Sequence, residues 1–188
     1  MRTWSRAYLV GVPALALGAV GLGCHGTTRG EGNMSLAVTS SAFRANHAVP
    51  REHTCDGQDR SPALAWSGAP EAARGFAVVM DDPDAPRGTW VHWVLWNLPA
   101  ATSALPAGVP PDERLESGAR QGRNDFRRIG WGGPCPPPGP AHHYSFRVYA
   151  LDALLDLEPG ATKADLERAM RGHVLAQGEL VGTYSRLR

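Results

Sequence analysis

The 188-residue sequence lacks several features that would place it in a common functional class. Its net charge is only +1, and it has no basic block interleaved with aromatic residues, so nucleic acid is not expected as a partner. After its first 24 residues there is no second apolar run that approaches the roughly 20 residues needed to cross a bilayer. No internal repeat is visible. These absences leave one globular domain of ordinary size as the expectation.

Recognised catalytic motifs are missing as well. The sequence has no nucleophile elbow, no His-Glu-x-x-His helix and no serine placed beside a histidine. A hydrolase that uses Asp82, His92 and His142 as an acid–base set or as metal ligands stays open as an alternative. No recognisable ligand spacing supports a zinc site in this set, and no cofactor is expected.

Cysteine is scarce, and the first of the three cysteines follows the pattern of an export signal. Arg2 and Arg6 precede an apolar segment over residues 7–22, and Cys24 follows closely. Positive charge, a short apolar segment and then small residues are the order of a secretory signal. We expect a lipoprotein acylated at Cys24, with plain cleaved secretion and an uncleaved anchor as the alternatives.

This signal divides the chain into three parts. We expect residues 1–24 to be the signal peptide, the polar and Gly-rich residues 25–34 to be a flexible tether, and residues 35–188 to form one domain. The expected location is the cell envelope, facing the periplasm. Contact with the membrane is then expected through the lipid anchor only.

The other two cysteines, Cys55 and Cys135, form an even pair in a protein expected to meet an oxidising compartment. Such a pair usually forms a disulfide, and we favour a Cys55–Cys135 bridge. Two buried thiols that behave as small apolar side chains are the alternative. A zinc site is disfavoured because neither cysteine has a second one at short spacing.

Short apolar runs separated by many prolines and glycines favour a β-rich domain over a helical bundle. Thr162 and Asp165 resemble a capping box, and the spacing of the apolar residues after them predicts one helix that stops near Gly178. Residues 90–98 are apolar on both faces and predict a central strand. The expected strands lie at residues 36–40, 63–66, 75–80, 90–98, 143–151 and 179–186.

Residues 82–86, Asp-Pro-Asp-Ala-Pro, are the most informative stretch of the chain. They follow the apolar run 76–80, so Asp82 and Asp84 are expected where a buried strand ends. Each proline fixes its own φ and restricts the residue before it, which makes the loop rigid. An ordinary acidic turn and one side of a pocket are both compatible with this pattern.

Three other polar residues lie in or beside apolar strands. His92 stands in the most apolar strand and needs a hydrogen-bond partner, whether it is functional or a satisfied core histidine. His142 and Tyr144 are two residues apart in a strand and therefore share a face, although Tyr144 equally suits the core. The preceding run 132–140 is rich in Gly and Pro and is either a linker or a rigid pocket wall.

Together these motifs resemble the phosphatidylethanolamine-binding protein family, and more closely its bacterial, Raf-kinase-inhibitor-like branch. The resemblance covers residues 35–188 and rests on the acidic loop, His92, the Gly-Gly-Pro-Cys-Pro-Pro run and the His-x-Tyr pair. Further matches are Thr54-Cys55-Asp56-Gly57, Ser61-Pro62, Trp66, Asn124-Asp125-Phe126, residues 172–176 and residues 178–184.

The resemblance implies a mainly β fold. Its central antiparallel sheet is packed with a second smaller sheet, and it has one C-terminal helix and a few short helices. The resemblance also implies a small pocket for phosphate, a phosphorylated headgroup or acetate. The implied ligand-binding residues are Asp82, His92, Pro137, His142 and Tyr144. The implied supporting residues are Asp84, Pro86, Gly133 and Pro136.

The function expected from these arguments is the non-catalytic capture of a small phosphorylated or anionic ligand. Asp82 is itself negative, so it suits such a pocket only if it orients a histidine and favours the imidazolium. The alternative is an inhibitor or interaction module whose partner is a kinase or protease, and a homodimer is compatible with either role.

Overall fold

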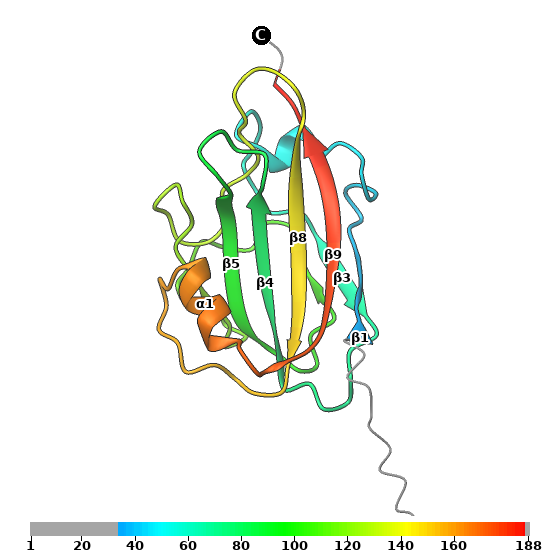
Figure 1. Ribbon diagram of the computed structural model, residues 1–188, viewed down its shortest axis with the longest axis vertical. Helices are drawn as coiled ribbons and strands as arrows, with labels where there is room; N and C mark the ends of the chain where they lie inside the picture. Colours follow the sequence, from blue (N-terminus) through cyan, green and yellow to red (C-terminus); the bar gives the residue numbers. More distant parts are fainter. Residues whose placement is uncertain (1–33, 187–188) are drawn as a thin grey trace, which may run out of the picture. The chain divides into compact units, whose positions relative to one another are not determined.

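The protein is described here from a computed structural model that covers residues 34–186 (Figure 1). The expected signal peptide, the acylation site Cys24 and nearly all of the expected tether lie outside the described residues. No helix within residues 34–186 is long and apolar enough to cross a membrane.

Six strands form the larger sheet, in the spatial order β1-β9-β8-β4-β5-β7. Neighbouring strands are antiparallel, except that β1 runs parallel to β9. The prediction of a central antiparallel sheet is confirmed. The strands are β1 Met34–Ser35, β4 Gly75–Asp82, β5 Trp90–Pro99, β7 Arg120–Gln121, β8 His142–Leu151 and β9 Val174–Tyr184.

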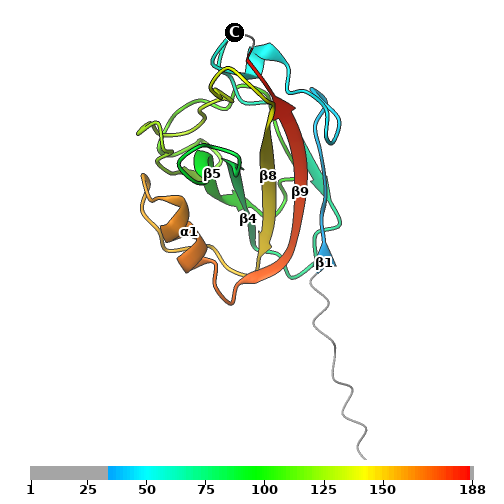
Figure 2. The same ribbon diagram turned by 45° about the horizontal axis from the view of Figure 1, so that its top comes forward.

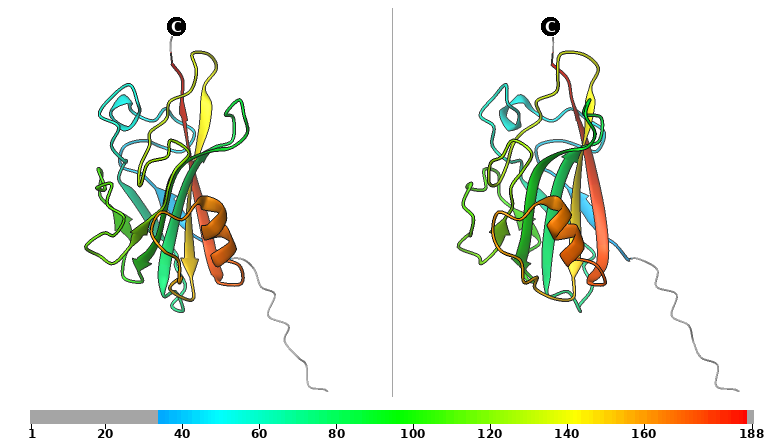
Figure 3. Two further views of the ribbon diagram at one scale, coloured as in Figure 1. Left: turned by 90° about the vertical axis from the view of Figure 1, so that its left-hand side faces the viewer. Right: turned by 60° about the vertical axis from the view of Figure 1, so that its left-hand side comes forward.

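A second, smaller antiparallel sheet covers one face of the larger sheet, and the helix α1 lies over the other face (Figure 3). The smaller sheet has the order β2-β3-β6, and these elements complete the predicted mainly β fold. The bounds are β2 Ala37–Thr39, β3 Leu64–Ser67, β6 Ala104–Leu105, the 3-10 helix η1 Arg51–His53 and α1 Lys163–Ala169.

Alternation along β4 divides its side chains between two apolar layers. Val78 and Met80 belong to the core shared with the smaller sheet, and Ala77 and Val79 belong to the core beneath α1. Because both faces are covered, the strand is apolar at successive positions. The same alternation sends the last two residues of the strand, Asp81 and Asp82, to opposite faces.

The helix is shorter than the sequence predicted. The capping box is confirmed, since Thr162 Oγ1 accepts from Asp165 N at 3.3 Å and Asp165 Oδ2 accepts from Thr162 N at 3.0 Å. However, α1 ends at Ala169, and Gly172 has a φ of 80°. The prediction of helix up to Gly178 is wrong because residues 174–178 pair with β8 instead. Sheet pairing therefore overrides the helical spacing of the apolar residues.

The prediction that residues 90–98 form a central strand, as opposed to an edge strand, is confirmed, because β5 pairs with β4 on one side and with β7 on the other. β7, on the outer side of β5, has only two residues. Irregular chain completes that edge, because Gly122 N donates to Val94 O at 2.9 Å and Gly132 N donates to His92 O at 3.0 Å. The strand is apolar because its two faces are covered, not because strands flank it.

At one end of the larger sheet, η1, the β7–β8 connection and the end of β9 come together (Figures 1 and 2). β4 ends at this same edge, and β5 and β8 begin there. The acidic loop, His92 and His142 are thereby brought to one end of the domain.

Asp81 attaches the helix to the sheet through a buried ion cluster. Its carboxylate is 1% exposed, accepts from Arg147 Nη1 at 3.0 and 3.1 Å, and accepts from Lys163 Nζ at 2.6 Å. Burial tends to lower the pKa of Lys163, but the hydrogen bond and the charge of Asp81 outweigh burial and raise it. Since Lys163 belongs to α1, this cluster holds α1 against the sheet.

We predict that the double variant Arg147→Met/Lys163→Met loses about 3–5 kcal/mol of unfolding free energy, because it leaves a buried carboxylate without a counter-charge. Urea unfolding at neutral pH measures the loss. The matched control is Arg168→Met on the same helix, where the arginine is exposed and pairs with Asp165 on the surface, and where we expect about 1 kcal/mol or less. Equal losses in the two variants would contradict the role given to Asp81.

Candidate functional site

A pocket of about 280 Å³ opens where β4 ends and β5 and β8 begin. Four of the five expected ligand residues, Asp82, His92, Pro137 and His142, line it. The supporting residues Pro86 and Pro136 line it as well. The remaining predicted residues, Tyr144, Asp84 and Gly133, are not part of the lining. They support the residues or segments that form it.

Asp82 fixes the orientation of His142. The carboxylate is 3% exposed, and its Oδ2 accepts from His142 Nδ1 at 2.8 Å. Its Oδ1 accepts from Asp84 N at 2.9 Å, which closes the turn of the acidic loop. Because Nδ1 of His142 donates its hydrogen bond to Asp82, the other ring nitrogen, Nε2, is the one available to a ligand.

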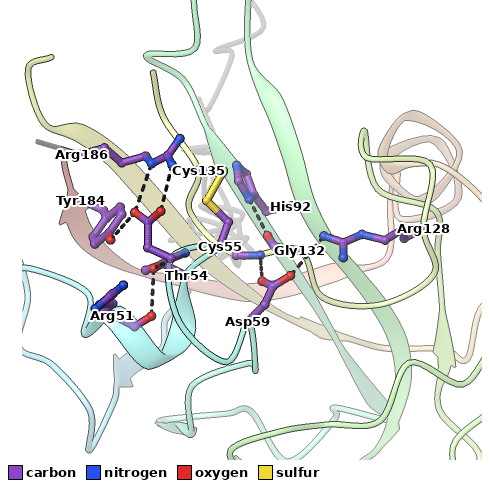
Figure 4. Close-up of a disulfide and its surroundings, with 12 residues drawn as sticks. Arg51, Thr54, Cys55, Asp59, His92, Arg128, Gly132, Cys135, Tyr184 and Arg186 are labelled. Carbon is purple, nitrogen blue, oxygen red and sulfur yellow. Dashed lines mark hydrogen bonds and ion pairs between the residues drawn. A yellow bond between two sulfur atoms is a disulfide. The ribbon is translucent and has the colours of Figure 1, made fainter. Parts of the chain in front are cut away.

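His92 is oriented by the backbone instead of by a carboxylate. Its ring is 2% exposed, and Nδ1 donates to Gly132 O at 2.5 Å (Figure 4). Burial lowers the pKa of His92, and the hydrogen bond to Gly132 and the negative charge of Asp82 only partly oppose this. His92 is therefore neutral near pH 7, with Nδ1 protonated and with an unprotonated Nε2.

Tyr144 lies behind His92 instead of on the pocket wall. The two rings meet edge to face, with centroids 5.3 Å apart. The Tyr144 hydroxyl is buried, and no acceptor within residues 34–186 meets hydrogen-bond geometry with it. Burial and then the charge of Asp82 raise the pKa of Tyr144, so its hydroxyl keeps its proton at any physiological pH. The tyrosine supports the histidine through its ring.

Asp84 holds the acidic loop to the start of β8. Its Oδ2 accepts from the backbone N of His143 at 2.8 Å and from the Nδ1 of the same residue at 2.7 Å. These two bonds lower the pKa of Asp84. Asp84 therefore positions the loop that carries Asp82, and its own carboxylate is not on the pocket surface.

The Gly/Pro-rich run forms the opposite wall. Cys135, Pro136 and Pro137 line the pocket, and the Sγ atom of Cys135 lies 2.06 Å from that of Cys55 (Figure 4). Gly133 N donates to Asp59 Oδ1 at 2.7 Å. A side chain at Gly133 does not fit, because a Cβ there would lie 2.4 Å from His53 O. The wall is therefore fastened to the segment that follows η1.

Three lining residues were missed by the sequence reasoning: Arg87, Trp90 and Phe126. Phe126 is packed edge to face against both Trp90 and His92, with centroids 5.4 and 5.2 Å apart. Trp90 was expected only as part of an apolar strand, and Phe126 only as part of a family motif. Arg87 directly follows the acidic loop, which was the one available signal for it.

The lining of this pocket limits the chemical groups that it can present to a ligand. None of its lining residues is Ser, Thr or Lys, and its cysteine is placed against Cys55. Within residues 34–186, no group of three or more His, Cys, Asp or Glu side chains is arranged to hold a metal ion. What the pocket does offer is two histidines with fixed Nδ1 protons, a rim arginine and aromatic walls.

Comparisons with known proteins agree on one family. The sequence profile of the phosphatidylethanolamine-binding protein family matches residues 39–185. A UPF0098 protein of Pyrococcus horikoshii is 46% identical over 191 residues, which covers 95% of this chain and 94% of that protein. A UPF0098 protein of Methanothermobacter thermautotrophicus is 49% identical over 151 residues, which covers 80% of this chain and 99% of that protein.

Solved structures show the same relationship. The crystal structure of a phosphatidylethanolamine-binding protein homologue from Chlamydia trachomatis matches with a TM-score of 0.74 and 37% identity, over 82% of this chain and 99% of that chain. The crystal structure of Escherichia coli YbcL matches with a TM-score of 0.74 and 35% identity, over 81% of this chain and 99% of that chain.

We predict that the paired variant Cys55→Ser/Cys135→Ser loses about 2–4 kcal/mol of unfolding free energy, because a cross-link between distant segments restricts the unfolded chain. Urea unfolding with and without a thiol reductant measures this. The wild-type protein should move to the lower midpoint in reductant, and the variant should not respond. If the urea midpoint of the wild-type protein is the same with and without the reductant, the disulfide is contradicted.

Proposed function

The chain belongs to the phosphatidylethanolamine-binding protein family, and from this premise we propose that it is a non-catalytic binding protein for a small phosphorylated or anionic ligand. The ligand occupies the pocket between the acidic loop and the Gly/Pro-rich wall. The observation that carries the proposal is the pair of buried histidines, each with Nδ1 bonded to the protein and Nε2 left for the pocket.

The charges of the pocket favour an anion once the histidines are protonated. A ligand oxygen that accepts a hydrogen bond from Nε2 requires that nitrogen to carry a proton, which makes each ring an imidazolium. Asp82 accepts a hydrogen bond from His142 Nδ1, which leaves Nε2 of that ring for the ligand, and Arg87 adds a cation at the rim. Two imidazolium rings and Arg87 against the one carboxylate of Asp82 leave a surplus of two positive charges, which matches a phosphate monoester dianion.

The walls favour an anion attached to an organic group. Trp90, Phe126, Pro136 and Pro137 surround the polar groups with apolar surface. A free phosphate ion gains nothing from this surface, whereas the ester group of a phosphorylated headgroup buries part of itself against it. The mixture of a few convergent polar groups with apolar walls is typical of small-molecule sites.

The proposed location is the cell envelope, with the domain facing the periplasm on a lipid anchor at Cys24. The order of charge, apolar segment and cysteine at the start of the chain supports this proposal. The closeness of Cys55 and Cys135 is consistent with it, because disulfides persist in oxidising compartments.

We predict that anion affinity rises as pH falls from 8 to 5. Burial lowers the pKa of His92, and a bound anion raises it, so binding takes up protons. Affinity should then change by up to about tenfold per pH unit for each proton taken up. NMR titration with sulfate, whose charge is constant over this range, measures the effect on the His92 and His142 rings, with phosphate as a second probe.

The control in the same spectra is His173, which pairs with Asp152 on the surface and does not line the pocket. Its ring signals should not respond to the anion. An affinity for sulfate that stays flat with pH would overturn the proposed charge mechanism.

We also predict that Asp82→Asn weakens sulfate binding at pH 6 by about tenfold, because His142 Nδ1 loses the carboxylate to which it donates a charge-assisted hydrogen bond and which fixes its ring. The matched control is Asp84→Asn, which removes the same charge from the loop but not from His142, and which should change affinity by less than about threefold. Tighter binding by Asp82→Asn would mean that Asp82 only repels the anion, which would refute its proposed role.

A further inference from the structure

A second groove, of about 630 Å³, lies next to the pocket and shares no lining residue with it. Two residues connect them. Arg128 lines the groove, and its guanidinium carbon lies 5.3 Å from the ring centre of Phe126, which lines the pocket. Asp59 lines the groove and accepts from Gly133 N in the Gly/Pro-rich run that forms the pocket wall. The groove is therefore separate from the pocket, but residues that line the groove contact residues that form the pocket wall.

Arg60 lines this groove and forms no ion pair within residues 34–186. Its guanidinium makes no hydrogen bond with any side chain or carbonyl of the described residues. It is instead packed against Gly108, where an added Cβ would lie 3.3 Å from both Nε and Nη2 of Arg60. Gly108 has a φ of 74°, which disfavours other residues, so the backbone leaves this space for the guanidinium.

Arg128 supplies a second guanidinium, which, within residues 34–186, is held in place by a single side-chain hydrogen bond from its Nη2 atom and by an aromatic ring. Its Nη2 donates to Asp59 Oδ2 at 3.3 Å, and its plane is supported by the Phe126 ring. Asp59 is itself committed through Oδ1 to Gly133 N at 2.7 Å. The lining of the groove thus holds two arginines and one carboxylate, and the formal charge of these three residues sums to +1.

Most of the remaining lining is apolar. It consists of Val109, Pro110, Pro111, Ile129 and Trp131, together with Gly108 and the hydroxyl-bearing Ser61. Trp131 also keeps its indole N–H buried without an acceptor within the described part of the chain. Arginine forks bind carboxylates and phosphates in a planar, two-bond geometry, and the neighbouring apolar surface can bury an attached organic group.

We propose that this groove is a second binding site, for a small organic anion whose carboxylate or phosphate group meets Arg60 and Arg128 and whose apolar part lies against Trp131 and the two prolines. The site differs in kind from the pocket, because its cations are arginines and stay charged at every physiological pH. Anion affinity in the groove should therefore be independent of pH between 5 and 8 for a ligand of constant charge.

Two tryptophan indole signals separate the two sites in one NMR experiment. Trp131 lines only the groove and Trp90 lines only the pocket. We would titrate the ¹⁵N-labelled domain with phenyl phosphate and with benzoate, following the indole N–H of each tryptophan and the amide of Gly108. We expect Trp131 and Gly108 to shift with both probes, with a midpoint distinct from that of Trp90.

The decisive variant is Arg60→Gln, and its matched control is Arg44→Gln, which removes the same charge from an exposed arginine that lines neither site. Arg60→Gln should weaken the Trp131 response by about tenfold or more, since a charge-assisted bond is lost, and should leave the Trp90 response unchanged within about twofold. Arg44→Gln should leave both responses unchanged within the same limit.

The possible results distinguish this site from the proposed function. If Trp131 and Gly108 are silent while Trp90 shifts, the groove proposal is wrong and the pocket proposal stands. If the two arginine variants weaken the Trp131 response equally, the response is a general effect of charge and the groove proposal is wrong. A Trp131 response to phenyl phosphate but not to benzoate would narrow the ligand class to phosphates, and the reverse would narrow it to carboxylates.

Discussion

Two adjacent carboxylates at the end of β4 determine the arrangement of a large part of this domain. Asp81 and Asp82 are both nearly inaccessible to solvent, and a buried carboxylate must be paired or hydrogen-bonded. Because neighbouring residues of a strand face opposite sides, each finds partners in a different layer. Asp81 links α1 to β4 and β8 of the sheet, while Asp82 orients His142 at the edge of the pocket.

The pocket depends on rigid supports more than on its own polar groups. Asp84 and two prolines hold the acidic loop, and the segment after η1 holds the opposite wall through Asp59 and Cys55. The histidines between these walls have one ring nitrogen each committed to the protein. The proposed binding of an anion would therefore require few changes in side-chain position, and its main requirement would be the uptake of protons.

Much of the fold and part of the site could be predicted from sequence. Apolar runs located β4, β5 and β8, and the capping box located the start of α1. The end of α1 was missed because the spacing of apolar residues continues beyond Ala169, while sheet pairing with β8 decides the structure there. Arg87 and Phe126 were missed because neither has a local pattern that marks it as a pocket residue; a long connection and the end of a loop bring them there.

The sequence by itself determined the family, the mainly β character and the residues Asp82, His92, Pro137 and His142 as candidates, because local motifs and strand alternation are properties of short segments. Only the tertiary structure decided that Tyr144 lies behind His92, that Asp84 binds His143, and that Arg60 and Arg128 face one groove. These outcomes depend on contacts between segments far apart in the chain. Such contacts arise when the sheet and its connections pack together, and no short stretch of sequence contains them.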